Sequence, residues 1–210
     1  MEREQILDRV VETLSRIGPQ SMTMDAVAHS CGISKRTLYE LFPDKHTLIS
    51  EAVHMMHDRH KRAYEEIFRS SANNFEALLN VYKQVRHHIE NTSVVFLDDI
   101  KRLYPDIFEQ YRHNEKEAVK SFAGVVSKAQ QEGMVLPRIN SEVAATIFFI
   151  TMHNLKQSEA FFPSQHSRLE IFDGAFLNFV RGIATIKGIG FIDEFLSQNF
   201  TYNHNTTAQS

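Results

Sequence analysis

The chain has 210 residues, of which 42% are hydrophobic and 23% charged, and its formal net charge at pH 7 is -3. This length allows a substantial hydrophobic core in one domain or two. The absence of excess positive charge argues against a non-specific nucleic-acid binder, because such proteins gain their affinity from many phosphate contacts.

The first 30 residues predict two helices. Residues 3–17 place apolar side chains at helical spacing, and Gly18-Pro19 ends that pattern. Residues 24–30 form a second, shorter period, before which Thr23 can act as the N-cap. We expect the first helix to brace the pair of short helices that follows it, as the third member of a three-helix head.

A third helix follows a sharp turn. Gly32 allows the positive φ that such a turn requires, and Ser34 can cap a helix that runs to Phe42. Pro43 ends this helix, because it cannot donate a backbone hydrogen bond and disfavours helical geometry in the residue before it. Two short helices joined by a glycine-containing turn form a helix-turn-helix, whose second helix enters the major groove of DNA.

The second helix of this pair and its surroundings carry the candidate DNA contacts. Lys35, Arg36 and Thr37 are the candidates for base edges, because the N-terminal residues of a recognition helix reach the bases. The candidates for phosphate contacts are Thr23, Ser34, Tyr39 and Lys45.

Residues 23–48 read TMDAVAHSCGISKRTLYELFPDKHTL. In this run Gly32, Tyr39, Phe42, Lys45 and Leu48 follow the spacing Gly-(six residues)-Tyr-x-x-Phe-x-x-Lys-x-x-Leu. The pattern resembles the DNA-binding segment of TetR-family transcriptional regulators. The resemblance covers roughly the first quarter of the chain, and it implies an all-helical dimer with a ligand-binding body.

The rest of the chain is helical in pattern and has no alternating strand pattern of useful length. Helical periods cover residues 44–70, 74–89, 94–103, 105–129, 140–157 and 166–182, and a short link with a half-helix follows. We predict an all-α fold with a three-helix DNA-binding domain at 1–47, a helical bundle for ligand binding and dimerisation at 48–200, and a polar tail at 201–210.

The helices predicted at 140–157 and 166–182 are apolar on most faces, so most of their faces must be covered. In a chain of this size we expect one of the covers to be a second subunit. Regulators that the chain resembles dimerise through such a pair of helices, which implies a homodimer with a four-helix interface.

Bulky aromatic side chains are frequent between residues 75 and 179, and a helical bundle that holds them readily leaves an apolar cavity. The resemblance also implies a ligand pocket. Among our own candidates for its lining, Arg86 and His153 are the polar groups expected to orient the ligand. Ordinary core packing is the competing interpretation for each candidate. The candidates are Tyr82, Arg86, Phe96, Tyr104, Phe108, Tyr111, Phe122, Phe149, Met152 and His153.

Three alternatives stay open. His54, His57 and His60 recur at every third residue, so the regulator could answer to a metal, although a solvated helix face is the simpler interpretation. A body without a cavity would point to a protein partner. A helical enzyme with a vestigial DNA-binding head would need a polar acid/base cluster deep in the body, and neither G-x-S-x-G nor H-E-x-x-H occurs in the sequence. We expect no catalytic residue, no metal site and no cofactor.

The N-terminus lacks the basic segment and apolar run of a signal peptide, and the single Cys31 is typical of the reducing cytosol. The most apolar run, residues 143–152, is far shorter than the roughly 20 residues that span a bilayer. We therefore expect a cytoplasmic homodimer with no membrane contact. It would bind a pseudo-palindromic double-stranded DNA operator and repress transcription until a small apolar or amphipathic ligand enters the body.

Overall fold

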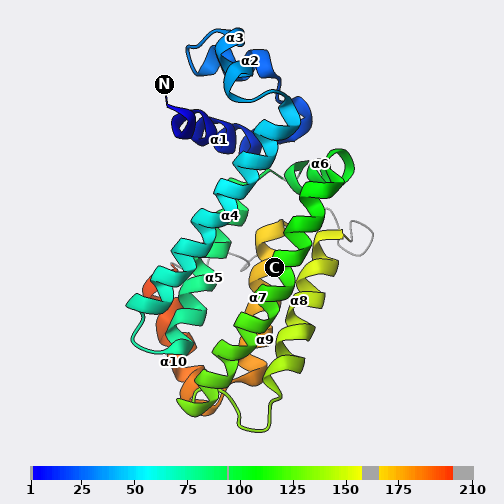
Figure 1. The fold of residues 1–210 in the computed structure, drawn as a ribbon. Coiled ribbons are helices and arrows are strands. Elements are labelled where there is room, and N and C mark those ends of the chain that lie inside the picture. The colour runs from blue at the N-terminus through cyan, green and yellow to red at the C-terminus, as the bar shows by residue number, and fades with distance from the viewer. Residues whose placement is uncertain (1, 94, 158–165, 201–210) are drawn as a thin grey trace, which may run out of the picture. The chain divides into compact units, whose positions relative to one another are not determined.

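The computed structural model describes residues 2–93, 95–157 and 166–200, with the side chains of these ranges apart from those of 111–115 and 153–157. Every regular element within these ranges is an α-helix (Figure 1), which confirms the predicted all-α class. The helices are α1 (Arg3–Ser21), α2 (Met24–Ser30), α3 (Lys35–Leu41), α4 (Lys45–Ser70), α5 (Asn74–Asn91), α6 (Val95–Leu103), α7 (Pro105–Gln131), α8 (Ser141–Gln157), α9 (Arg168–Ile183) and α10 (Ile186–Asn199). None of these described helices is both long and apolar enough to cross a membrane.

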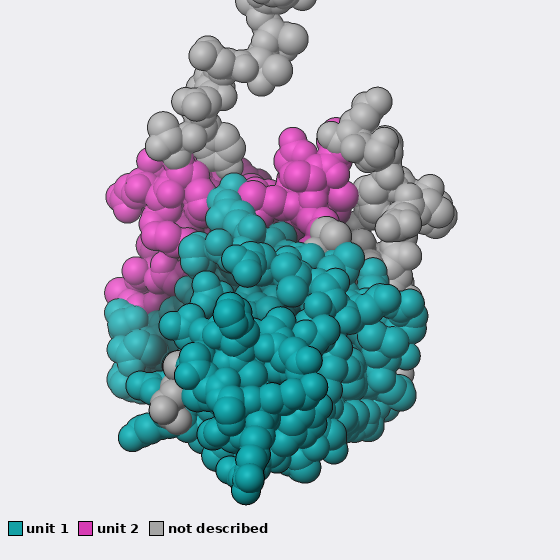
Figure 2. Space-filling model, turned by 90° about the horizontal axis from the view of Figure 1, so that it is seen from above, with its two compact units in different colours: residues 1–70, 84–118 teal, residues 71–83, 119–210 magenta. Residues whose placement is uncertain are grey.

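Two compact units divide the chain, and Figure 2 colours them separately. The first unit combines residues 1–70 with 84–118, and the second combines 71–83 with 119–210. The predicted DNA-binding domain at 1–47 lies wholly within the first unit. Its boundary with a body at 48–200 stays a prediction, and the predicted tail at 201–210 lies outside the described residues.

The core of the first unit is formed by the four helices α1, α2, α3 and α4 together with α6 and the start of α7. Its apolar side chains come from one face of each helix, as the 3.6-residue period requires. The most deeply buried members are Ile6, Val10, Leu14, Met22, Leu38, Phe42, Leu48, Ile49, Ala52 and Ile100. This core fixes α3 to the rest of the head, because Leu38 and Phe42 have no exposed surface.

The second unit is built on α8 and α9, which pack against each other, together with α10 and parts of α5 and α7. The Glu132 carboxylate accepts hydrogen bonds from the backbone N–H groups of Asn74 and Phe75 at the start of α5. A carboxylate is favourable there, because the first N–H groups of a helix have no partner within it. The link between α7 and α8 forms an isolated β-bridge, Val135 to Ala184.

The predicted break after residue 17 falls at Gly18, whose φ is 77° and ψ is 162°, and one further helical turn follows it within α1. One expected element differs from the structure. The half-helix expected after residue 182 is a helix of 14 residues, α10, with Thr185 as its N-cap. Glycines at positions 188 and 190 lower the helical propensity of this segment. Gly188 is required there, because a Cβ atom would lie 2.3 Å from the backbone oxygen of Met134.

Candidate nucleic-acid interface

Side-chain caps fix the two short helices of the head. The Thr23 hydroxyl accepts a hydrogen bond from the backbone N–H of Ala26 at 3.1 Å, as expected of an N-cap. Gly32 has a φ of 65°, the left-handed geometry predicted for the turn. The Ser34 hydroxyl accepts from the backbone N–H of Thr37 at 3.0 Å and so caps α3. These two hydroxyl groups, both candidates for phosphate contacts, are therefore already engaged in capping.

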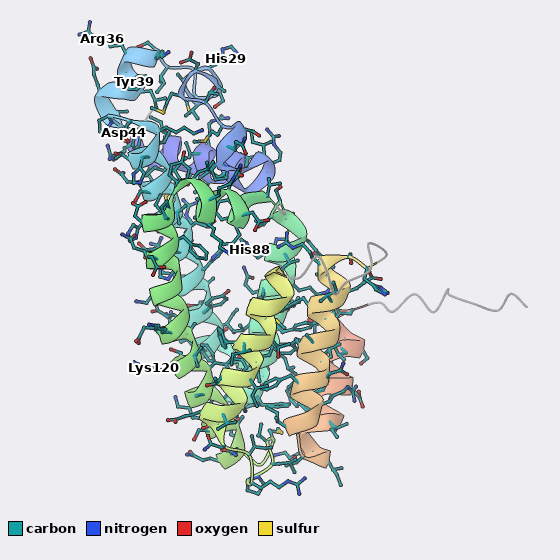
Figure 3. The ribbon with its side chains drawn as sticks, turned by 90° about the vertical axis from the view of Figure 1, so that its right-hand side faces the viewer. His29, Arg36, Tyr39, Asp44, His88 and Lys120 are labelled. Atoms are coloured by element: carbon teal, nitrogen blue, oxygen red, sulfur yellow. The ribbon has the colours of Figure 1, made fainter. Side chains whose placement is uncertain are left out.

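The two faces of α3 differ sharply in exposure. Leu38 is fully buried in the core of the first unit. Lys35, Arg36 and Thr37 are exposed, and Tyr39 is 42% exposed although it is aromatic. Figure 3 shows Arg36 and Tyr39 together at the α3 end of this unit. The structure thus places the predicted base-reading residues side by side on one exposed surface, which we call the recognition surface.

Carboxylates neutralise both cations of the recognition surface. Lys35 Nζ lies 2.7 Å from Asp25 Oδ1 on α2, and this ion pair raises the pKa of Lys35 above its ordinary value. Arg36 Nε lies 2.9 Å from Glu40 Oε1 one turn along α3. Exposed ion pairs contribute little free energy, so DNA phosphates or base edges can replace these carboxylates as partners.

The start of α4 lies beside this surface. The backbone N–H of Thr47 donates to Asp44 Oδ1 at 2.7 Å, and this hydrogen bond lowers the pKa of Asp44. Lys45 Nζ lies 3.5 Å from the backbone oxygen of Gln20, and burial lowers its pKa. The Asp44 carboxylate thus occupies the backbone N–H of Thr47, which could otherwise donate to a phosphate. The Lys45 ammonium is therefore the main candidate for a phosphate contact here.

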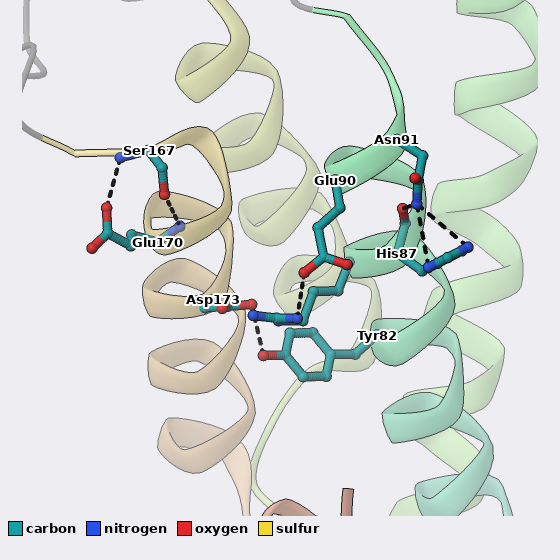
Figure 4. Close-up of polar contacts among 8 residues, drawn as sticks. Tyr82, His87, Glu90, Asn91, Ser167, Glu170 and Asp173 are labelled. Carbon is teal, nitrogen blue, oxygen red and sulfur yellow. Dashed lines mark hydrogen bonds and ion pairs between the residues drawn. The ribbon is translucent and has the colours of Figure 1, made fainter. Parts of the chain in front are cut away.

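Three pocket candidates of the first unit, Phe96, Tyr104 and Phe108, pack in its core. Phe96 is buried among the helices of the head, and Tyr104 and Phe108 pack against the same cluster. Arg86 Nη1 pairs with Glu90 Oε1 at 2.7 Å, one turn along α5 (Figure 4). The side chain of Tyr111 lies outside those described. For Phe96, Tyr104 and Phe108, core packing is the interpretation that these contacts favour.

The pocket candidates of the second unit belong to an aromatic cluster. The ring of Phe122 stacks on Phe148, at 5.1 Å between centroids, and meets Phe149 edge to face. Tyr82 is buried, stacks on Phe176 at 4.4 Å and donates its hydroxyl hydrogen to Asp173 Oδ1 at 2.7 Å (Figure 4). We name this group the aromatic cluster: Tyr82, Phe122, Phe148, Phe149, Phe172, Phe176 and Phe179.

Sequence reasoning missed several of these groups. Phe148, Phe172 and Phe176 were not among the pocket candidates, and neither was the polar partner Asp173. The apolar run around Phe148 was visible, but only the fold brings it to Phe122 and Phe176. Of the other two candidates in this unit, Met152 on α8 is half-buried and His153 has a side chain outside those described.

The histidine series on α4 does not gather three ligands. His60 contacts His88 on α5 instead, with ring centroids 4.5 Å apart and the rings edge to face. Among the described residues, no group of three His, Cys, Asp or Glu side chains is arranged to hold a metal ion.

A family model described as "Bacterial regulatory proteins, tetR family" matches residues 6–52. This range begins in α1, contains the whole helix-turn-helix and ends in the second turn of α4. The chain carries the TetR-family DNA-binding domain. The resemblance found in residues 23–48 is thereby confirmed. The TetR-family domain contains every residue that we predicted to contact DNA.

Solved structures extend the likeness from the TetR-family domain to most of the chain. A transcriptional regulator from Saccharomonospora viridis in complex with choline has a TM-score of 0.71 at 16% identity, covering 87% of this chain and 97% of that one. A TetR-family regulator from Agrobacterium tumefaciens has a TM-score of 0.69 at 16% identity, with the same two shares covered. The ketosteroid transcriptional regulator of Mycobacterium tuberculosis has a TM-score of 0.58 at 19% identity, covering 87% of this chain and 95% of that one.

At such low identity these structures share the fold, which is that of a TetR-family transcriptional regulator. A search of curated proteins found no match to the chain.

Proposed function

We propose that the protein is a cytoplasmic, homodimeric repressor that reads a pseudo-palindromic operator through α3 and releases it when a small molecule binds. The observation that carries the DNA-reading part is the recognition surface. Lys35, Arg36 and Thr37 stand in solvent on a helix whose other face is buried, which is the arrangement that a recognition helix needs. In this proposal Lys45 and Tyr39 contact phosphates, together with the capping hydroxyls of Thr23 and Ser34.

Dimerisation is supported by an apolar stripe on α8. Val143, Ile147 and Ile150 are 53%, 55% and 55% exposed, and their spacing places them on one face of the helix. Large aliphatic side chains at this exposure favour a covering partner. We propose that the same stripe of a second chain covers it, in an interface formed by the helices at 140–157 and 166–182. Two copies of α3 would then enter successive major grooves about 34 Å apart.

Ligand release is supported by the aromatic cluster of the second unit. Rings of this size suit an apolar or amphipathic ligand, and the hydroxyl of Tyr82 with the Asp173 carboxylate offers polar groups beside them. The similar regulator from Saccharomonospora viridis is a complex with choline, so a protein of this fold can hold a small molecule. Release would be a coupling between ligand and operator, typically about 5- to 150-fold in affinity.

The dimeric reading mode is tested with a palindromic duplex selected from random sequences by the purified protein. Insertion of about 5 bp between the half-sites turns one of them to the opposite face of the duplex, since B-DNA has about 10 bp per turn. We expect this insertion to abolish tight binding. A 10-bp insertion should abolish it too, because it keeps both half-sites on one face but adds about 34 Å to their separation. Equal affinity for all three spacings would contradict a rigid dimeric reader.

Ligand release is tested with the amphipathic dye anilinonaphthalene sulfonate, whose fluorescence reports binding to apolar sites. We expect the dye to bind the protein and to weaken its affinity for the selected duplex. By linkage the duplex must weaken dye binding by the same factor. Dye that binds free and DNA-bound protein equally well would contradict release through this type of ligand.

A further inference from the structure

The C-terminal turn of α1 begins without a cap of its own. Gly18 interrupts the helix with a φ of 77°, and a single helical turn then runs from Pro19 to Ser21. The first N–H groups of any helical segment lack partners within it and are normally satisfied by the side chain of the preceding residue. Gly18 has no side chain, so another part of the chain must supply the acceptor.

Asp99 on α6 supplies it. Its Oδ2 atom accepts the backbone N–H of Gln20 at 2.9 Å, at the position that an N-cap acceptor occupies. Arg102 Nη2 donates to Oδ1 of the same carboxylate at 3.1 Å and also bonds the side-chain oxygen of Gln20. Among the side chains that the structure describes, Asp99 is the only buried charged one, with 6% of its surface exposed.

The two helices meet so closely at position 18 that any larger residue would force a neighbouring side chain to shift. A Cβ atom there would lie 2.8 Å from Val95 Cγ2 and 2.9 Å from Asp99 Oδ2. The conformation of Gly18 is also one that L side chains rarely adopt. Gly18 therefore serves both the turn and the close approach of α6, which packs along α1 in the first unit (Figure 1).

The turn that Asp99 caps leads directly into the DNA-reading head. Met22, which follows it, is fully buried, and Thr23 is the N-cap of α2. The backbone oxygen of Gln20 also accepts from the Lys45 ammonium at 3.5 Å. One residue, Gln20, thus connects the α6 carboxylate to the start of the helix-turn-helix and to the lysine proposed to hold a phosphate.

We propose that Asp99 is a positioning residue for operator binding. By capping the Pro19–Ser21 turn from α6, it fixes where α2 begins and where the Lys45 ammonium lies, and so holds the head in its DNA-competent arrangement. This inference rests on the proposed DNA-reading function.

The variants that test this proposal differ in whether residue 99 keeps an oxygen that can accept the backbone N–H of Gln20. Asp99→Asn keeps an oxygen that can accept from Gln20, whereas Asp99→Ala removes the acceptor. Asp98→Ala is the matched control, because Asp98 is the neighbouring carboxylate of α6 and is exposed. Loss of an N-cap side chain shifts an equilibrium by roughly 2- to 30-fold. A head that is less often competent loses apparent affinity in proportion.

The measurement is the affinity of each variant for the selected duplex and for a scrambled duplex at equal salt, per folded protein, well below the unfolding temperature. We expect Asp99→Ala to weaken operator binding by at most roughly 30-fold, a limit reached where the competent head is the minor state, and to weaken binding to scrambled DNA less. Asp99→Asn should recover most of the loss, and Asp98→Ala should match the wild type. A purely structural role would lower the unfolding temperature and leave the ratio of the two affinities unchanged, which would overturn the proposal.

Two further outcomes are separated by the same design. If Asp99→Ala does not fold, Asp99→Glu takes its place, since the longer side chain keeps the charge but does not fit the contact with Gly18. An unchanged affinity ratio in Asp99→Glu overturns the proposal equally. If the wild type itself does not distinguish the two duplexes, the proposed function fails, whatever the variants do.

Discussion

The Lys35 ammonium lies 2.7 Å from the Asp25 carboxylate, which ties the recognition helix to α2 through a contact that DNA must replace. Asp25→Asn removes this competitor, so we expect it to strengthen binding to operator and scrambled DNA alike. Both side chains are exposed, and such pairs are worth about 0.2–1 kcal/mol, which corresponds to a gain of at most about 5-fold. Fluorescence anisotropy at physiological salt measures it.

The control for this variant is Glu65→Gln, which removes the same charge from an exposed position 20 residues further along α4 than Lys45. That separation is about 30 Å along a helix and exceeds the screening length of about 8 Å at physiological salt. An equal gain in both variants would mean that net charge, and not the release of Lys35, is responsible.

Arg36 and Lys45 should differ in the kind of loss that their removal causes. A bidentate arginine contact with guanine discriminates by about 1–3 kcal/mol, so Arg36→Ala should lower operator affinity by roughly 5- to 150-fold and relax base preference at one position. Lys45→Ala should weaken all sequences alike and reduce the salt dependence of binding by about one phosphate contact. Equal losses on operator and scrambled DNA for Arg36→Ala would reject its assignment as a base reader.

If the apolar stripe on α8 forms the dimer interface, one charged side chain placed in it should weaken the dimer. Ile147→Glu places a carboxylate at the centre of the stripe, so we expect the dimer to dissociate at micromolar concentration in analytical ultracentrifugation. Operator affinity should fall with it, because the two half-sites are no longer read by linked heads. Ile186→Glu is the control, an identical change at a side chain that is 91% exposed on α10. Dissociation in neither variant would place the dimer contact elsewhere.

His60 predicts a pH dependence of stability. Burial, together with the charge of His57, lowers the pKa of His60 below its ordinary value of 6.5, and the ring packs between Tyr64 and His88. An unfolded chain titrates near 6.5, so as pH falls below that value it binds more protons at this position than the folded protein does. Stability should therefore fall as pH drops from about 7.5 to 5.5.

Urea unfolding midpoints at the two pH values measure this effect. His60→Asn should flatten the dependence, whereas His54→Asn, at an exposed histidine of the same helix, should not. The same slope in wild type and His60→Asn would show that other groups cause the loss.

Local chemistry explains why the head could be predicted from the sequence. Thr23 caps the first turn of α2, and Ser34 caps the first turn of α3. Gly32 adopts a positive φ because it has no side chain, and Pro43 ends α3. Each of these effects acts within three or four residues. The exposure of Arg36 follows in the same way, because Leu38 fixes the buried face of α3.

Features that depend on distant contacts could not be predicted. In the sequence Gly188 argues against a helix, because glycine has low helical propensity. Its reason for being there is visible only in the fold, where the backbone of Met134 lies against it. The capping role of Asp99 could not be predicted from the neighbouring aspartates at 98 and 99. Only the fold places Asp99 against the backbone of Gln20. Phe148 likewise joins the aromatic cluster through residues of other helices.

The central claim is that α3 reads a DNA sequence. The most direct measurement is fluorescence anisotropy of the purified protein on its selected duplex and on a scrambled duplex of equal length, at physiological salt, beside the Lys35→Ala/Arg36→Ala double variant. We predict tight binding of the wild type to the selected duplex alone, and loss of that preference in the double variant. Equal affinity of the wild type for both duplexes, or an unchanged preference in the double variant, would contradict the account.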